Sequence, residues 1–120
     1  MLDNRYKFFI SSLLKKTKES QVNWQPTSSQ YAFIVTEEDV SITISSDSDE
    51  FNREYTSLTI RDKSGKVIDN ISIDENEKDY LVLSDLFNEA RRKANNVDET
   101  IDKLIKKLSN DGEFGEQPAF

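Results

Sequence analysis

The sequence predicts an α+β fold made of an N-terminal helix, a four-stranded antiparallel meander, and one or two C-terminal helices packed on one face of the sheet. Apolar residues recur at helical spacing near the N-terminus, at every second position in the middle of the chain, and again at helical spacing toward the C-terminus. The predicted strands follow one another without intervening helices. They are therefore expected to pair with their neighbours in sequence, which is typical of the α+β class.

The length and the periodicity together predict one small folded domain. The chain has 120 residues, of which 35% are hydrophobic and 32% charged. This apolar content is modest, but its regular spacing is typical of a folded chain, and 120 residues suffice for one core. We expect a single α+β domain over residues 1–108 and a flexible acidic tail over 109–120, where two glycines and one proline interrupt any period.

The first helix is predicted to begin at Asp3, which can act as its N-cap. Its apolar face consists of Tyr6, Phe9, Ile10, Leu13, Leu14 and Thr17. The helix must end before Pro26, because the residue preceding a proline is biased away from helical geometry. Trp24 therefore lies where the chain passes from helix to sheet. It either closes the core against Leu13 and Leu14, with its indole N–H bonded to a loop carbonyl, or forms a partly exposed anchor for a partner.

Four strands are predicted from alternating apolar residues in the middle of the chain. They are expected near residues 31–35, 40–45, 55–61 and 67–73. Gly65 lies in the turn between the last two strands, where it can adopt a positive φ angle. The face of the sheet opposite the helices would present Ser41, Thr43, Ser45, Ser57, Thr59, Asn70 and Ser72. This face is either solvated or a docking surface.

Helical spacing returns after residue 79. Its apolar positions are Tyr80, Leu83, Leu86, Phe87, Ala90 and Ala94, followed by Val97, Ile101, Leu104, Ile105 and Leu108. Asn95 and Asn96 interrupt the pattern, and Asn96 with Glu99 has the spacing of a capping box that starts a new helix. The pattern leaves open whether this region is one kinked helix or two.

The missing residue types argue against catalysis. The chain contains no cysteine and no histidine, which removes thiolate chemistry, zinc sites that need sulfur, and the commonest general acid–base group. There is no G-x-G-x-x-G motif, phosphate-binding P-loop or complete EF-hand calcium loop. No apolar run is long enough to span a bilayer. We therefore expect a soluble, cytoplasmic, non-enzymatic protein without cofactor or metal.

The negative charge is concentrated in the predicted sheet. The whole chain carries −7, whereas residues 30–79 carry thirteen acidic and five basic side chains. In a meander, the loops around SSDSDEFNRE and DENEKD should lie at the same end, where they could either solubilise the domain or contact a basic partner. The residues predicted to bind a partner are Asp47, Asp49, Glu50, Asp74, Glu75 and Glu77, together with Trp24 and, from the tail, Phe114.

A second hypothesis places a small ligand such as a nucleotide on the basic cluster near residue 92. Arg91, Arg92 and Lys93 would bind its anionic group, and Tyr80 or Trp24 would stack on it. Extended nucleic acid is not expected, because the sequence pI is near 4.6.

Several segments resemble small uncharacterised proteins of low-GC Gram-positive bacteria and their prophages. These segments are F-x-x-x-L-L-x-x-T from Phe9 to Thr17, Trp24, IRDKSGKVIDNISID, and LSDLFNEARRKANNVDETIDKLIKKL. In length, acidity and richness in Lys, Asn and Ser, the chain is also similar to prophage inhibitors of bacterial defence proteins, including inhibitors of defence-associated sirtuins. This resemblance implies a phage-type inhibitor, anti-defence or immunity-like, that binds and blocks a larger bacterial protein.

Overall fold

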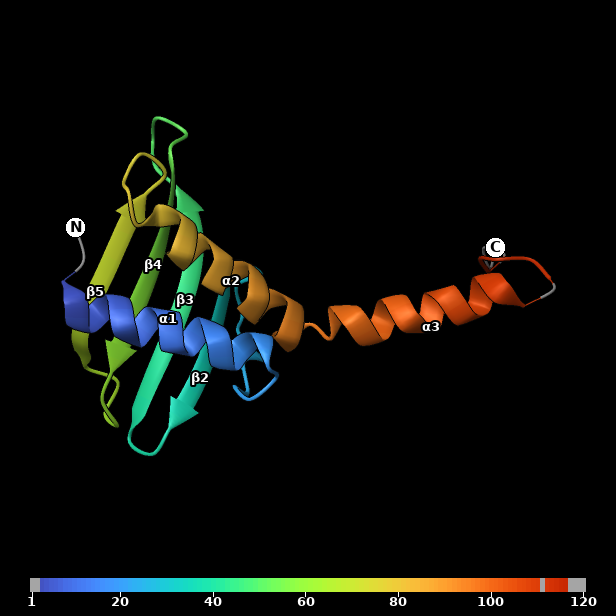
Figure 1. The fold of residues 1–120 in the computed structure, drawn as a ribbon, viewed down its shortest axis with the longest axis horizontal. Helices are drawn as coiled ribbons and strands as arrows, with labels where there is room; N and C mark the ends of the chain where they lie inside the picture. The colour runs from blue at the N-terminus through green and yellow to red at the C-terminus, as the bar shows by residue number, and fades with distance from the viewer. Residues whose placement is uncertain (1–2, 111, 117–120) are drawn as a thin grey trace.

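The structure, a computed structural model, describes residues 3–110 and 112–116 and confirms the α+β class. In chain order the elements are α1 (Asn4–Lys18), β1 (Gln25–Pro26), β2 (Ala32–Glu37), β3 (Val40–Ser48), β4 (Glu54–Arg61), β5 (Val67–Asp74), α2 (Tyr80–Ala94) and α3 (Val97–Ser109) (Figure 1). The sheet has five strands rather than the four predicted. The additional strand, β1, is only two residues long and includes a proline, so it has no alternating pattern to detect.

The five strands form an antiparallel meander in the order β1-β2-β3-β4-β5. One row of paired apolar residues crosses the sheet, running from Phe33 through Ile44 and Leu58 to Ile71. Because side chains alternate between the two faces of a strand, these partners all point toward the helices. The sheet therefore buries one apolar face and leaves the other polar.

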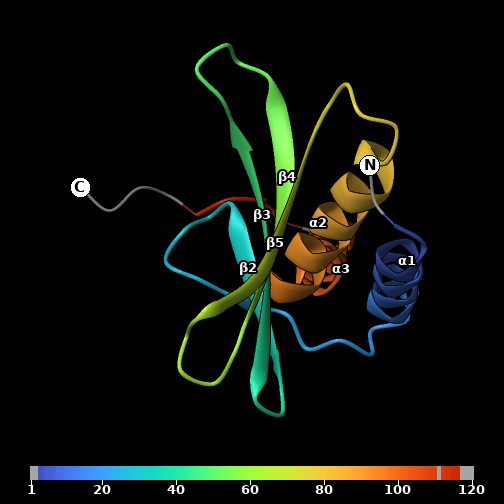
Figure 2. The same ribbon diagram turned by 90° about the vertical axis from the view of Figure 1, so that its left-hand side faces the viewer.

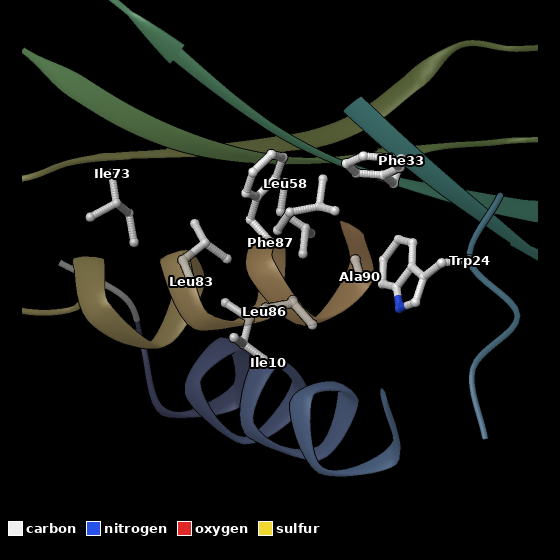
Figure 3. Close-up of a cluster of buried hydrophobic side chains, with 10 residues drawn as sticks. Ile10, Trp24, Phe33, Leu58, Ile73, Leu83, Leu86, Phe87 and Ala90 are labelled. Carbon is white, nitrogen blue, oxygen red and sulfur yellow. The ribbon is translucent and has the colours of Figure 1, made fainter. Parts of the chain in front are cut away.

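The helices form two further layers above the buried face of the sheet. Helix α2 lies against the strands, while α1 packs mainly on α2 and reaches the sheet through the hydrogen bond from Tyr6 to Asp69 of β5 (Figure 2). The core includes Ile10 of α1 beside Leu86 of α2, and the rings of Phe33 and Phe87 lie 5.7 Å apart between sheet and helix (Figure 3). Asp3 caps α1 as predicted, because its carboxylate accepts the backbone N–H of Tyr6 at 3.0 Å.

Trp24 belongs to the core, which confirms the first of its two predicted roles and rules out the second, an exposed anchor for a partner. Its side chain is only 3% exposed and lies beside Ala90 (Figure 3). The indole Nε1–H donates to the Thr17 hydroxyl at 3.0 Å, rather than to the loop carbonyl that we expected. The Thr17 hydroxyl in turn donates to the Leu13 carbonyl at 2.7 Å. This chain of bonds satisfies a buried donor that has no access to water.

The C-terminal helical region is two helices, and the second leaves the body of the domain. The helical segment is interrupted at Asn95 and Asn96, and Asn96 adopts a left-handed conformation with φ 52°. Its side chain makes no capping hydrogen bond, although α3 begins where the capping-box spacing predicts. Helix α3 has no buried residue and projects from the sheet (Figure 1).

The extended position of α3 explains the elongated shape. The radius of gyration is 17.6 Å, compared with about 14 Å for a compact chain of this length. The predicted domain of residues 1–108 thus includes a helix that does not join the core. Ser109, which we assigned to the tail, is the last residue of α3, and residues 111 and 117–120 of the predicted tail lie outside the described residues.

Candidate protein-contact site

Two acidic loops meet at one end of the sheet, as the meander predicts. They connect β3 to β4 and β5 to α2, and both lie at the upper end of the molecule in Figure 1. The backbone N–H of Glu75 donates to the carbonyl of Glu54 at 2.9 Å, and the N–H of Glu54 donates to the Glu75 carboxylate at 3.4 Å. We call residues 47–54 and 74–79 the acidic end.

The acidic end carries most of the net charge of the chain. It contains eight carboxylates and two cations, a net charge of −6. The opposite end of the sheet, residues 36–40 and 61–66, contains four carboxylates and three cations, a net charge of −1. Because carboxylates gathered on one surface make the local potential more negative, the negative potential should be stronger at the acidic end than at the opposite end of the sheet.

Asp49 holds the β3–β4 loop in shape. Its carboxylate accepts the backbone N–H groups of Phe51 at 2.8 Å and Arg53 at 3.0 Å, and it also accepts the Arg53 Nε–H at 3.0 Å. These bonds, led by the one from the Arg53 backbone, hold the pKa of Asp49 below its ordinary value. The charge of Asp49 is thus partly balanced within the loop, and the residue serves mainly to order it.

The ordered loop presents Phe51, a candidate contact residue that was not predicted from the sequence. Its side chain is 71% exposed, and the Arg53 guanidinium lies 5.6 Å from the centre of its ring. An aromatic residue surrounded by polar ones in SSDSDEFNRE was the available signal. Aromatic side chains are common anchors of protein interfaces, and this one lies within residues 47–54, which also carry Asp47, Asp49, Glu50 and Glu54.

The β5–α2 loop uses two of its carboxylates for its own structure. Asp74 accepts the backbone N–H of Asn76 at 2.9 Å, and Glu77 accepts that of Asp74 at 3.3 Å. Tyr80, at the start of α2, donates its hydroxyl to Glu54 at 3.4 Å. Tyr80 therefore contacts the acidic end. Six carboxylates were predicted to bind a partner. Three of them are exposed and contribute least to the hydrogen bonds that order the loops: Asp47, Glu50 and Glu75.

The polar face of the sheet adjoins the acidic end. Hydrogen bonds of 2.7 Å link the Ser57 and Ser72 hydroxyls and join the Asn70 amide to the Thr59 hydroxyl. Near the acidic end this face is hollowed by a shallow depression of about 270 Å³. It is lined by Ser29, Tyr31, Ala32, Ser45, Ser46, Asp47, Tyr55, Ser57, Thr59 and Asn70. Tyr31 and Tyr55 thus lie on the sheet face beside Asp47 of the acidic end.

The residues of the predicted ligand site do not converge. Arg91, Arg92 and Lys93 lie in the last turn of α2 and Tyr80 in its first, so about 18 Å of helix separates them. Trp24 is buried and offers no face to a ligand. Arg92 instead donates to Asp98 of α3. A cleft of about 300 Å³ lies at this junction, lined by Ser20, Val22, Arg92, Lys93, Asn96, Asp98 and Glu99.

Phe114 is exposed but is not brought to the acidic end. It lies in the segment that follows α3, and α3 leads away from the sheet (Figure 1). Within residues 3–110 and 112–116, no group of three or more acidic side chains has an arrangement suited to a metal ion. No helix in these ranges is long and apolar enough to cross a membrane.

No protein-family model matches the chain, and no curated protein or solved structure matches it significantly.

Proposed function

We propose that the chain is a non-catalytic protein-interaction module whose acidic end binds a basic surface on a larger protein. The observation that carries this proposal is the meeting of two acidic loops at one end, with a net charge of −6 against −1 at the other. The absence of His and Cys from the sequence supports a role without catalysis.

The two kinds of side chain at the acidic end have different roles in this proposal. The carboxylates attract a basic patch from a distance and raise the association rate. The exposed ring of Phe51 supplies apolar contact once the partner has arrived. The biological role that we propose is that of a phage-type inhibitor, anti-defence or immunity-like, which blocks a larger bacterial protein. Its support is the similarity of the chain, in length, acidity and richness in Lys, Asn and Ser, to prophage inhibitors of bacterial defence proteins.

A test compares two matched triple variants. The first is Asp47→Asn with Glu50→Gln and Glu75→Gln at the acidic end. The control, Glu37→Gln with Glu38→Gln and Asp39→Asn, changes the net charge equally at the opposite end of the sheet.

The partner is first captured from a low-GC Gram-positive lysate, identified, purified, and then measured by surface plasmon resonance. We expect the acidic-end variant to lower the association rate at low salt by on the order of tenfold. The control should change it less than twofold, and high salt should remove the difference. Equal association rates for the two variants would contradict the proposed site.

A second function, the binding of a small anionic ligand, is favoured by the cleft beside Arg92 and Lys93. The acidic residues Asp98 and Glu99 line the same cleft and weaken its attraction for an anionic ligand. Thermal unfolding with a panel of nucleotides tests this function, since a ligand at a hundred times its dissociation constant stabilises the folded chain by about 2.7 kcal/mol. No shift in midpoint across the panel would exclude nucleotides as its ligands.

A further inference from the structure

Helix α3 exposes one continuous apolar stripe. Counting about 100° per residue along the helix, the five side chains of the stripe fall within an arc of about 100°. They are Val97, Ile101, Leu104, Ile105 and Leu108. The last four are between 44% and 63% exposed, and within the described residues α3 packs against no strand (Figure 1). Among the described helices and strands, α3 therefore carries the most exposed large apolar side chains.

The stability of α3 is expected to depend on covering this stripe. Isolated helices shorter than about 12–15 residues are marginal in water, and most helical stability in proteins comes from packing an amphipathic face. Helix α3 has 13 residues, and its attachment to the body lies at its first turn, where Arg92 donates to Asp98. The remaining turns depend on a surface outside the domain.

The dimensions of the stripe favour a groove over a second copy of the same helix. An arc of about 100° is wider than the narrow seam of a two-stranded coiled coil. Two copies of α3 packed lengthwise would share a strip about 20 Å long and about 10 Å wide. That contact is small beside the roughly 800 Å² that each partner buries in a standard stable interface. A groove that encloses the stripe on both sides buries more of it.

The charges beside the stripe specify the rims of that groove. By the same angular count, Asp98 and Asp102 border one edge of the stripe and Lys107 borders the other. Glu99 and Lys106 lie on the far side of the helix. A complementary groove therefore carries a cationic rim facing the two aspartates and an anionic rim facing the lysine.

We propose that α3 docks as an amphipathic helix into an apolar groove on another protein, with one cationic and one anionic rim. Ile101, Leu104 and Leu108 fill the groove, and Ile105 packs on the side of the acidic edge. This contact is separate from the acidic end, since α3 projects away from the sheet (Figure 1). It goes beyond the proposed function, because it does not require that function to be correct.

The experiment uses the full chain with a photoreactive amino acid, p-benzoylphenylalanine, in place of Leu108 or, as the control, of Lys106. The first position lies in the stripe and the second on the far side of the same turn. After irradiation in a low-GC Gram-positive lysate, the cross-linked peptides are sequenced. Affinity for the purified cross-linked protein is then measured for Ile101→Ser with Leu104→Ser, and for the far-side control Glu99→Ser with Lys106→Ser.

The proposal predicts a cross-link from position 108 but not 106, to a segment with apolar residues and charged residues of both signs nearby. The stripe variant should weaken binding by about tenfold or more, and the far-side control by less than twofold. The acidic-end triple variant should still give the cross-link from position 108. If that variant abolishes the cross-link while the stripe variant leaves affinity unchanged, the proposed function stands and this inference fails.

Two other outcomes would overturn the inference. If analytical ultracentrifugation shows a wild-type dimer that the stripe variant abolishes and the far-side control keeps, a second copy covers α3. If positions 108 and 106 cross-link equally weakly, the stripe remains in water.

Discussion

The hydrogen bond between Trp24 and Thr17 gives the sharpest test of how the core is organised. Replacing Thr17 with valine keeps the shape of the side chain but removes the hydroxyl that accepts the indole N–H at 3.0 Å. Thr17 is fully buried and Trp24 only 3% exposed, so water cannot replace the lost partner. Leaving a buried donor unsatisfied costs about 1–3 kcal/mol. The Leu13 carbonyl loses little, since the helix ladder also supplies it with a backbone N–H.

We therefore expect Thr17→Val to lower the free energy of unfolding by about 2 kcal/mol. For a domain of this size, that corresponds to a fall in melting temperature of about 8 °C. Urea unfolding followed by far-ultraviolet circular dichroism measures the change without relying on tryptophan emission. Thr17→Ser, which keeps the hydroxyl, serves as the control and should cost less.

A double-mutant cycle separates the hydrogen bond from packing. In a Trp24→Phe background no indole N–H remains, so Thr17→Val should cost much less, and the coupling energy should be about 1–2 kcal/mol. If Thr17→Val costs the same in both backgrounds, or less than about 0.5 kcal/mol alone, the bond does not hold this part of the core together.

Three further predictions concern the edge of the sheet and its turns. The hydrogen bond from Tyr6 lowers the pKa of Asp69 and raises that of Tyr6, so its stabilisation is present above the ordinary carboxyl pKa of about 4 and below about pH 10. The stability difference between wild type and Tyr6→Phe, measured by urea unfolding, should shrink as pH falls through the lowered pKa of Asp69 or rises above about 10; a difference independent of pH would contradict it. Asp49→Ala should speed amide exchange at positions 51 and 53 while the strand amides stay protected; unchanged exchange there would show that Asp49 does not order the loop. Gly65 has φ 89°, and no atom lies within 4 Å of the place that a Cβ would take. Gly65→Ala should therefore lower the free energy of unfolding by about 1–2 kcal/mol, measured with urea, from backbone strain alone. An unchanged free energy would mean that the turn relaxes.

Local physics made much of the candidate site predictable in outline. The meander topology follows from consecutive strands, and it places alternate loops at the same end. The neighbouring positions of the β3–β4 and β5–α2 loops were therefore expected from the sequence. That Asp49, Asp74 and Glu77 order their own loops was not expected. The sequence pattern of an acidic loop residue is the same whether its carboxylate bonds backbone N–H groups or faces water.

Other features depended on contacts between distant parts of the chain. Strand β1 exists because Gln25 and Pro26 lie alongside β2, and nothing in two residues signals that pairing. Tyr80 was predicted to stack on a ligand held by the basic cluster near residue 92, yet the length of α2 holds Tyr80 and this cluster at opposite ends. The sequence signals Phe51 only as an aromatic residue among polar ones, and its exposure depends on how the loop folds.

Apart from strand β1, the sequence by itself determined where helices and strands form, because spacing, caps and turn residues act over a few positions. The cap at Asp3, the turn at Gly65 and the start of α3 after Asn96 are all of this kind. Only the tertiary structure decided what each apolar face meets. The same amphipathic pattern is buried in α2 and uncovered in α3, because coverage depends on where the chain carries a helix after it has formed.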